Sequence, residues 1–463
     1  MMLRAPRLAT GAAALCLLAA AGCATLPDPD AHIERHTGQA ARFATASGPV
    51  SVQRSAAILA DLKRKSGDID ILEKQIALEQ GVVGSPLILG NKVTLLQDGP
   101  ATYAAMFAAI RQARDHINLE TYIIEDDEIG RQFADALLAQ QARGVQVNLI
   151  YDSVGGIRTP KAFFERLTQG GIEVLEFNPI NPLAAKKSWL INNRDHRKLL
   201  VVDGRTAFIG GINISSVYSS GSGGRRSAKA PGNAVAWRDT QIQIDGPVVG
   251  ELQKLFMQTW EKQHGKPLAA KEYFPALKPQ GNDIVRAIGS TYDDPYSLIY
   301  LTLISAIGNA EKTVHLTNAY FVPDPQLLKS LTDAAGRGVE VKLILPSHSD
   351  SAVVFHAGRA HYTGLLKGGV KLYERVGALL HSKTAVIDGV WSTVGSTNLD
   401  WRSFLDNDEV NAVILGREFA QKMQAMFASD LEGSQAIDPQ RWERRPISLR
   451  VKEWMARLWE RLL

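Results

Sequence analysis

The sequence is poor in cysteine: it has only Cys16 and Cys23 among 463 residues. Two thiols cannot build a disulfide framework or a cysteine-rich metal site, so both are excluded. An excess of one charge is also missing, because 52 basic and 48 acidic residues leave a net charge of +4, which does not by itself indicate a nucleic-acid-binding protein. With 45% hydrophobic and 22% charged residues, the composition is that of a globular protein, not of a disordered or polytopic membrane protein.

The first 23 residues predict an export signal. A basic start precedes the apolar stretch Leu8 to Ala21, which is too short and too rich in alanine to span a bilayer well. It ends in Ala-Ala-Gly-Cys23, which resembles the bacterial lipobox, in which the cysteine becomes the acylated first residue of the mature protein. We therefore expect a signal peptide over residues 1–22, lipidation of Cys23 and a membrane protein of the bacterial cell envelope. A signal peptide cut elsewhere and an uncleaved anchor are the alternatives.

Ala24, where an aspartate would retain a lipoprotein at the inner membrane, favours the outer membrane by the sorting rule of this class. The rest of the chain would then lie in the periplasm.

From about residue 95, strand and helix patterns follow one another in the same order twice. The first round has strand patterns at 117–124 and 145–151 around a helical face that contains Ile129, Phe133 and Leu137. The second round has strand patterns at 314–321 and 339–345 around a helical pattern at 327–335. Both helix-to-strand junctions read Arg-Gly-Val, and glycine there supplies a left-handed turn. This repetition predicts two α/β lobes from an internal duplication.

Two histidines carry the same surrounding pattern. The residues at +2, +7, +14 and +17 are Lys198, Asp203, Gly210 and Asn213 after His196, and Lys383, Asp388, Gly395 and Asn398 after His381. Residues two apart on a strand share a face, so each histidine and its lysine project together. Each Asp-Gly pair predicts a hairpin turn, and the returning strand brings the asparagine near the histidine.

An imidazole, an ammonium and an amide suit a phosphodiester substrate. Lysine and asparagine donate hydrogen bonds to the non-bridging oxygens, and imidazole can act as nucleophile or proton donor near neutral pH. A single histidine beside a lysine is usually a surface residue, and duplication alone preserves spacing. Duplication does not explain why the retained polar residues are those suited to phosphate chemistry, so the pattern favours a catalytic site.

The doubled pattern HxK(x)4D(x)6GxxN resembles the paired signature of the phospholipase D superfamily, over about residues 95–430. The resemblance implies an α/β fold of two lobes about a pseudo-twofold axis, each a mixed β-sheet flanked by helices, with one shared active site. It implies that one histidine attacks phosphorus and the other serves as acid and base. By resemblance His196 is the nucleophile and His381 the acid/base, although the symmetry of the motifs leaves this open.

The same resemblance implies roles for four carboxylates. Asp239 and Glu409 match the positions that orient the histidines in this family, with a surface acid as the alternative at each. Asp203 and Asp388 complete the motifs at the hairpin turns, where we interpret them as structural partners.

Within the superfamily, the residues around the motifs resemble bacterial cardiolipin synthases. The similar stretches are HRKLLVVDGRTAFIGGINIS, NAYFVPD and GSTNLDWRSFLDNDEVN. The resemblance implies a phosphatidyltransferase that joins two phosphatidylglycerol molecules through a phosphohistidine and needs no cofactor or metal. Alternatives are a hydrolase, other phosphodiesterase or nuclease that uses water as acceptor, and a non-catalytic envelope lipoprotein. We expect a membrane phospholipid substrate, no nucleic acid and no obligate protein partner.

The patterns predict five segments along the chain. They are a signal peptide at 1–22, a tether and lead-in at 23–94, lobes at 95–270 and 271–435, and a basic amphipathic helix at 436–463. In the last, Ile447, Val451, Trp454, Met455, Leu458 and Leu462 form an apolar stripe. The helix either lies on anionic lipid or docks on the lobes with its basic face in solvent.

Overall fold

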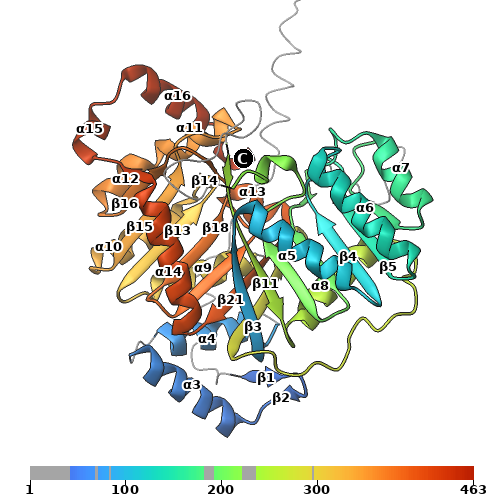
Figure 1. Ribbon diagram of the computed structural model, residues 1–463. Coiled ribbons are helices and arrows are strands. Elements are labelled where there is room, and N and C mark those ends of the chain that lie inside the picture. The colour runs from blue at the N-terminus through green and yellow to red at the C-terminus, as the bar shows by residue number, and fades with distance from the viewer. Residues whose placement is uncertain (1–41, 68–70, 83–84, 182–191, 222–235, 295–296) are drawn as a thin grey trace, which may run out of the picture.

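The computed structural model describes residues 42–67, 71–82, 85–181, 192–221, 236–294 and 297–463 (Figure 1). The expected signal peptide and Cys23 lie outside these residues. The first lobe is the cyan and green half of Figure 1, and the second is the yellow to red half.

The first lobe begins with a long strand and alternates strands with helices. Its elements are β3 (Leu87–Gln97), α5 (Asp98–Gln112), β4 (His116–Thr121), α6 (Glu128–Ala142), β5 (Gln146–Asp152), α7 (Lys161–Gln169), β6 (Glu173–Phe177), β7 (Arg194–Asp195), β8 (Lys198–Val202), β9 (Thr206–Gly210), η1 (Ser216–Tyr218), β10 (Trp237–Arg238), β11 (Thr240–Asp245) and α8 (Val249–Lys262).

The second lobe repeats this order. Its elements are β12 (Asp283–Ser290), α9 (Leu298–Gly308), β13 (Thr313–Asn318), β14 (Phe321–Val322), α10 (Pro325–Gly336), β15 (Glu340–Pro346), α11 (Ala352–Ala360), α12 (Tyr362–Lys367), β16 (Lys371–Arg375), β17 (Leu379–Leu380), β18 (Lys383–Ile387), β19 (Trp391–Gly395), β20 (Leu399–Asp400), α13 (Trp401–Leu405), β21 (Asn407–Leu415) and α14 (Arg417–Glu432).

Shorter segments lie at the two ends of the described chain. They are β1 (Phe43–Thr45), β2 (Gly48–Pro49), α3 (Val52–Ser66) and α4 (Ile71–Val82) before the first lobe, and β22 (Ser434–Ala436), α15 (Pro439–Glu443), α16 (Ile447–Arg457) and η3 (Glu460–Leu462) after the second.

The strand pairing has the expected pseudo-twofold symmetry. In the first lobe the order is β6-β5-β4-β8-β9-β11-β3, and in the second it is β16-β15-β13-β18-β19-β21-β12. In each lobe the first three strands are parallel and the rest antiparallel, and β3 pairs with β12 where the lobes meet. The predicted fold of two mixed sheets flanked by helices is therefore confirmed.

The elements expected from sequence periodicity are present in both lobes. Helix α6 buries Ile129, Phe133 and Leu137 against the sheet, as the spacing predicts. Gly144 and Gly338, at the two Arg-Gly-Val junctions, have φ angles of +90° and +91°. Both glycines thus adopt the left-handed conformation that admits the next strand.

Three large hydrophobic clusters form most of the core. One lies under α5, α6 and α7 in the first lobe, and one lies under α9 and α10 in the second. The third joins the lobes, because it combines side chains of both sheets with apolar faces of α8 and α14. Because apolar side chains of both lobes are buried together, the lobes are held in a fixed relative position, as are the residues at their junction.

The segment before the first lobe packs on the second one. Phe43, Ile71, Leu72 and Ile76 are buried in the same cluster as α9 and α10, more than 200 residues later in the chain. Within the predicted lead-in, the described residues form β1, β2, α3 and α4, and β3 begins at Leu87, ahead of the expected start of the first lobe at residue 95.

Candidate active site

Two very short strand pairs bring the two motifs together. Strand β7, just before His196, runs parallel to the start of β21 in the other lobe, and the His196 amide donates to the Asp408 carbonyl at 2.9 Å. Strand β17, just before His381, runs parallel to β10 in the first lobe, and the His381 amide donates to the Arg238 carbonyl at 2.7 Å. Each histidine therefore enters the site along a strand of the opposite lobe.

Each imidazole is held by a carboxylate of the opposite lobe. Nδ1 of His196 lies 2.9 Å from Oε1 and 3.1 Å from Oε2 of Glu409. Nδ1 of His381 lies 2.7 Å from Oδ2 of Asp239. With Nδ1 donating to a carboxylate, Nε2 is the ring nitrogen that can react with a substrate.

The motif lysines are buried beside the histidines. Nζ of Lys198 donates to the His196 carbonyl at 2.6 Å, and Nζ of Lys383 donates to the His381 carbonyl. Burial lowers the pKa of Lys198 to about 7 and that of Lys383 to about 8. Both lysines also lower the pKa of the two histidines, and Lys383 lowers the pKa of Lys198, because like charges repel one another.

The pKa values of the histidines reflect burial and their neighbours. Burial lowers the pKa of His196 to about 4, although Glu409 opposes the shift. Burial and Lys383 lower the pKa of His381. The pKa of Glu409 falls to about 2 despite its burial, because His196 and Lys198 stabilise the carboxylate. His196 is thus a neutral base next to a permanent carboxylate at neutral pH.

The two motif asparagines differ in their surroundings. Asn213 accepts the Ile123 amide at 3.1 Å and donates to the Tyr218 hydroxyl at 3.1 Å. Asn398 lines a cleft between the two lobes, and its buried Oδ1 has no hydrogen-bond partner among the described residues. A buried polar atom without a partner at a cleft is a position for a ligand contact.

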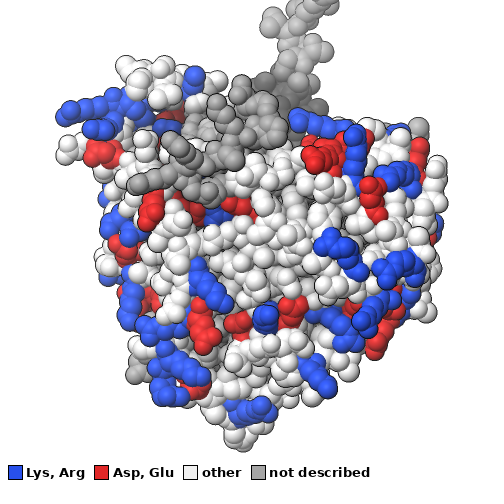
Figure 2. Space-filling model, in the orientation of Figure 1, with Lys and Arg blue, Asp and Glu red and all other residues white. Residues whose placement is uncertain are grey.

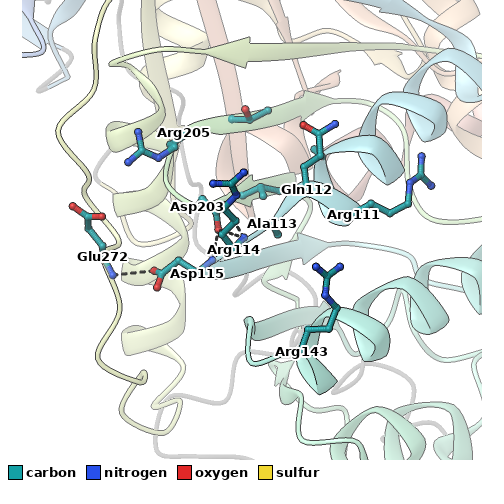
Figure 3. A pocket seen from close by; sticks show the side chains of 12 residues that line it. Arg111, Gln112, Ala113, Arg114, Asp115, Arg143, Asp203, Arg205 and Glu272 are labelled. Carbon is teal, nitrogen blue, oxygen red and sulfur yellow. Dashed lines mark hydrogen bonds between the residues drawn. The ribbon is translucent and has the colours of Figure 1, made fainter.

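The motif aspartates lie away from the imidazoles, at the far ends of the hairpins. Asp203 and Asp388 both have φ of +52° in their turns. Asp203 accepts the backbone amides of residues 114, 115 and 116 at 2.8–3.2 Å, and Asp388 accepts those of residues 311, 312 and 313 at 2.8 Å. Figure 3 shows Asp203 in the wall of a separate pocket lined by several arginines. Each aspartate thus ties its hairpin turn to the start of the neighbouring strand, β4 or β13.

Four aromatic side chains near the histidines were not identified from the sequence. The rings of Tyr122 and His196 lie 5.1 Å apart, and those of Trp237 and His381 lie 5.2 Å apart. The Tyr218 hydroxyl lies 3.4 Å from Nδ1 of His381, and the Tyr320 ring lies 6.1 Å from that imidazole. Tyr320 belongs to the NAYFVPD stretch, so the family resemblance could have indicated it.

The lobes differ at the residue that contacts each carboxylate. In the second lobe the Ser396 hydroxyl donates to Glu409. The corresponding residue of the first lobe is Gly211, where an added Cβ would lie 2.2 Å from Oδ1 of Asp239. The Asp239 carboxylate therefore occupies the space that the serine side chain fills in the other lobe.

Both imidazoles open on one cleft of about 550 Å³ between the lobes. Its walls also include Tyr122, Asn213, Tyr218, Tyr320, Asn398 and the last two residues of the chain. Within the ranges described above, no group of three or more histidine, cysteine or acidic side chains could hold a metal ion. No helix in the same ranges is long and apolar enough to cross a bilayer.

Comparison with known proteins agrees with this geometry. A family model described as "Cardiolipin synthase, PLD-like domain" matches residues 106–220 and 303–431, one part in each lobe. A cardiolipin synthase of Geobacillus kaustophilus is 34% identical over 381 residues, which cover 82% of this chain and 74% of that protein. The chain belongs to the cardiolipin synthase family. Cardiolipin synthase 2 of Bacillus anthracis is also 34% identical, over 80% of this chain and 70% of its own length.

The fold is shared beyond the cardiolipin synthase family. A phosphatidylserine synthase of Haemophilus influenzae superposes with a TM-score of 0.61 at 11% identity, over 83% of this chain and 99% of that one. At this identity the similarity shows the fold alone. The predicted membership of the phospholipase D superfamily is confirmed by the family model that matches both lobes and by the cardiolipin synthase relatives.

Proposed function

We propose that this chain is a phosphatidyltransferase of the cardiolipin synthase type, which moves a phosphatidyl group from one phosphatidylglycerol to a hydroxyl of another. The observation that carries the proposal is the crossed arrangement of the site. Two imidazoles open on one cleft, each held at Nδ1 by a carboxylate of the opposite lobe. Such a pair supplies a nucleophile and a proton carrier to one phosphorus.

In the first half of the reaction, neutral His196 attacks phosphorus through Nε2. The new N–P bond replaces the bond from phosphorus to the glycerol oxygen, and His381 gives that oxygen a proton. Lys198 and Lys383 stabilise the non-bridging oxygens, where charge accumulates. The low pKa of His196 keeps its lone pair available for this attack.

In the second half, the hydroxyl of another phosphatidylglycerol replaces glycerol. His381 removes its proton, the oxygen bonds to phosphorus and the N–P bond breaks, which regenerates both histidines. The products are cardiolipin and glycerol. The bound phosphodiester is an anion, so it raises the pKa of His381 and the lysines and allows His381 to carry the proton.

The direct test is a product assay. Purified full-length protein is incubated with phosphatidylglycerol vesicles, and the lipids are resolved by mass spectrometry. The proposal predicts cardiolipin together with free glycerol. Phosphatidic acid alone would mean that water is the acceptor and the protein is a phospholipase, and no lipid product at all would contradict the proposal.

We propose further that the protein is anchored in the envelope through acylated Cys23, with the catalytic lobes in the periplasm and the outer membrane as the favoured site. The support is the sequence alone, Ala-Ala-Gly-Cys23 followed by Ala24. Metabolic labelling with a radioactive fatty acid should mark the wild-type chain and not Cys23→Ala. Equal labelling of both chains would contradict the anchor.

A further inference from the structure

The C-terminal helix α16 turns its apolar side outward. The stripe predicted from the sequence (Ile447, Val451, Trp454, Met455, Leu458 and Leu462) is 49–77% exposed. Trp459, beside it, is 54% exposed. The helix does contact the second lobe, as one of the two predicted alternatives has it, but not through this stripe. A helix on a water-soluble surface normally buries its apolar side, so an outward stripe indicates a partner.

The opposite, polar side of α16 faces the second lobe. Glu453, on this side, is only 2% exposed and forms an ion pair with Arg445, just before the helix, with contacts of 2.7 Å, 2.9 Å and 3.2 Å. Ala456 packs with Ala357 of α11 in a small hydrophobic cluster. Beyond the helix, Glu460 contacts His361 at 3.1 Å. These contacts hold the helix in one orientation.

Basic side chains border the outward apolar stripe. At 100° per residue, Arg450 and Arg457 lie along one edge of the stripe and Lys452 along the other, and all three are exposed. Figure 2 shows Lys and Arg side chains beside uncharged ones at the upper left, where Figure 1 places α15 and α16. An apolar stripe with tryptophan and a cationic border matches an anionic bilayer surface.

The stripe continues into the wall of the catalytic cleft. After α16 the chain turns through η3, and Leu462 and Leu463 line the cleft. A main-chain oxygen of Leu463 accepts the Arg402 amide at 3.0 Å, which holds this residue in the wall of the cleft. Across the cleft, the first lobe contributes Ile157, which is 67% exposed, and the neighbouring Arg158. The cleft thus has an exposed apolar residue on each side, Ile157 and Leu462, and each is next to an arginine in the chain.

We propose that the outward face of α16, together with Ile157, docks the protein on an anionic phospholipid bilayer and holds the cleft mouth at headgroup level. The phosphodiester can then reach the histidines while the acyl chains stay in the bilayer along Leu458 and Leu462. This inference rests on the proposed function, because it gives the lipid substrate its route into the site. It is independent of Cys23, since it places the docking surface at the other end of the chain.

A second copy of the chain is the less suitable occupant. A twofold contact through α16 would bring Arg450, Lys452 and Arg457 of one copy close to the same residues of the other. Like charges at such an interface repel each other, whereas phosphate headgroups attract them.

The test compares a double variant, Trp454→Ser/Leu458→Ser, with Val52→Ser. Val52 is equally exposed, at 62%, but lies in α3, at the opposite end of the molecule from the C-terminus (Figure 1). Full-length proteins are assayed on phosphatidylglycerol vesicles and on short-chain phosphatidylglycerol dispersed as monomers. We expect the double variant to lose about tenfold or more of its vesicle activity and to keep its monomer activity within about twofold, with Val52→Ser unchanged on both.

Two further measurements separate the possible failures. Tryptophan fluorescence should be quenched by vesicles of brominated phosphatidylglycerol in the wild type and much less in Trp454→Phe/Trp459→Phe, whether or not the protein turns over. Quenching without turnover would refute the proposed function and support the docking surface. Equal vesicle activity of the double variant and wild type would overturn the inference, as would a dimer in sedimentation equilibrium that only the α16 substitutions dissociate.

Discussion

His196 and Glu409 are 213 positions apart in the chain, and Nδ1 of the imidazole lies 2.9 Å from Oε1 of the carboxylate. They belong to different lobes, and His381 with Asp239 forms the reciprocal pair at 2.7 Å. Neither motif histidine has its carboxylate partner in its own lobe. We therefore expect the two lobes to function only together, because each lobe supplies the carboxylate that contacts the imidazole of the other.

Replacing Glu409 by Gln tests this relationship. The Ser396 hydroxyl can still donate to the remaining oxygen, so the amide nitrogen faces His196 and donates to Nδ1. That places the ring proton on Nε2 and removes the lone pair needed for attack. We expect kcat to fall by about 100-fold or more in Glu409→Gln with an unchanged unfolding midpoint, and no loss in Glu432→Gln, an exposed control. A kcat within about threefold of wild type would show that the carboxylate does not orient the nucleophile.

Gly211→Ala should disrupt the other pair. The new Cβ would lie 2.2 Å from Oδ1 of Asp239, so the carboxylate must move and His381 loses its fixed orientation. We expect at least about a tenfold loss of kcat. Gly336→Ala is the matched control, because a Cβ there meets nothing within 4 Å. Steady-state kinetics of both variants would check this, and equal kcat values would contradict it.

Asp203→Ala should affect stability more than catalysis. The carboxylate accepts the Arg114, Asp115 and His116 amides at 2.8–3.2 Å and anchors the turn. Losing it should lower the free energy of unfolding by about 1–3 kcal/mol, with kcat per folded molecule retained. Urea unfolding and a kcat measured well below the unfolding midpoint would show this. A large fall in kcat without a loss of stability would instead give Asp203 a role in the reaction.

Lys198 should make stability depend on pH. Its pKa is about 7 in the folded protein, against 10.5 for an ordinary lysine, because burial disfavours the cation. Between these values the unfolded chain binds more protons, so the free energy of unfolding should rise with pH from 7 to 10.5, by up to about 1.4 kcal/mol per pH unit. Below pH 7 Lys198 is protonated in both states, so the full cost of burying its charge lowers the free energy of unfolding.

Lys198→Met should therefore stabilise the protein at pH 7, by roughly 1 kcal/mol or more, while it abolishes turnover. In urea unfolding, the substitution should also reduce the increase in the free energy of unfolding between pH 7 and pH 9. Lys329→Met, at a lysine whose side chain is 75% exposed, should change neither. A Lys198→Met protein less stable than wild type at pH 7 would mean that the site favours the charged lysine.

The hairpins of the site could be predicted because they depend on local sequence. The Asp-Gly turns and the spacing from histidine to asparagine fixed the pairing of β8 with β9 and of β18 with β19. The crossing of the pairs could not be predicted. It depends on β7 and β10, two-residue strands that pair with the opposite lobe, and two residues carry no periodicity.

The packing of the segments before the first lobe and after the second lobe could not be predicted either. The apolar stripe of α16 was recognisable from its spacing, but which side docks depends on the packing of Ala456 against α11 and on the contact of Glu460 with His361. Likewise, Ile71 and Ile76 pack into a core formed by residues far along the chain. Both outcomes are set by long-range packing, which a local pattern does not contain.

Double displacement through a phosphohistidine can be tested by capturing the covalent intermediate. Full-length protein is mixed with phosphatidylglycerol, quenched in alkali within milliseconds, digested and analysed by mass spectrometry. Double displacement predicts a phosphatidyl group on Nε2 of His196, and none in His196→Ala. An adduct on His381 would reverse the roles of the two histidines, and an active enzyme with an adduct on neither would contradict double displacement.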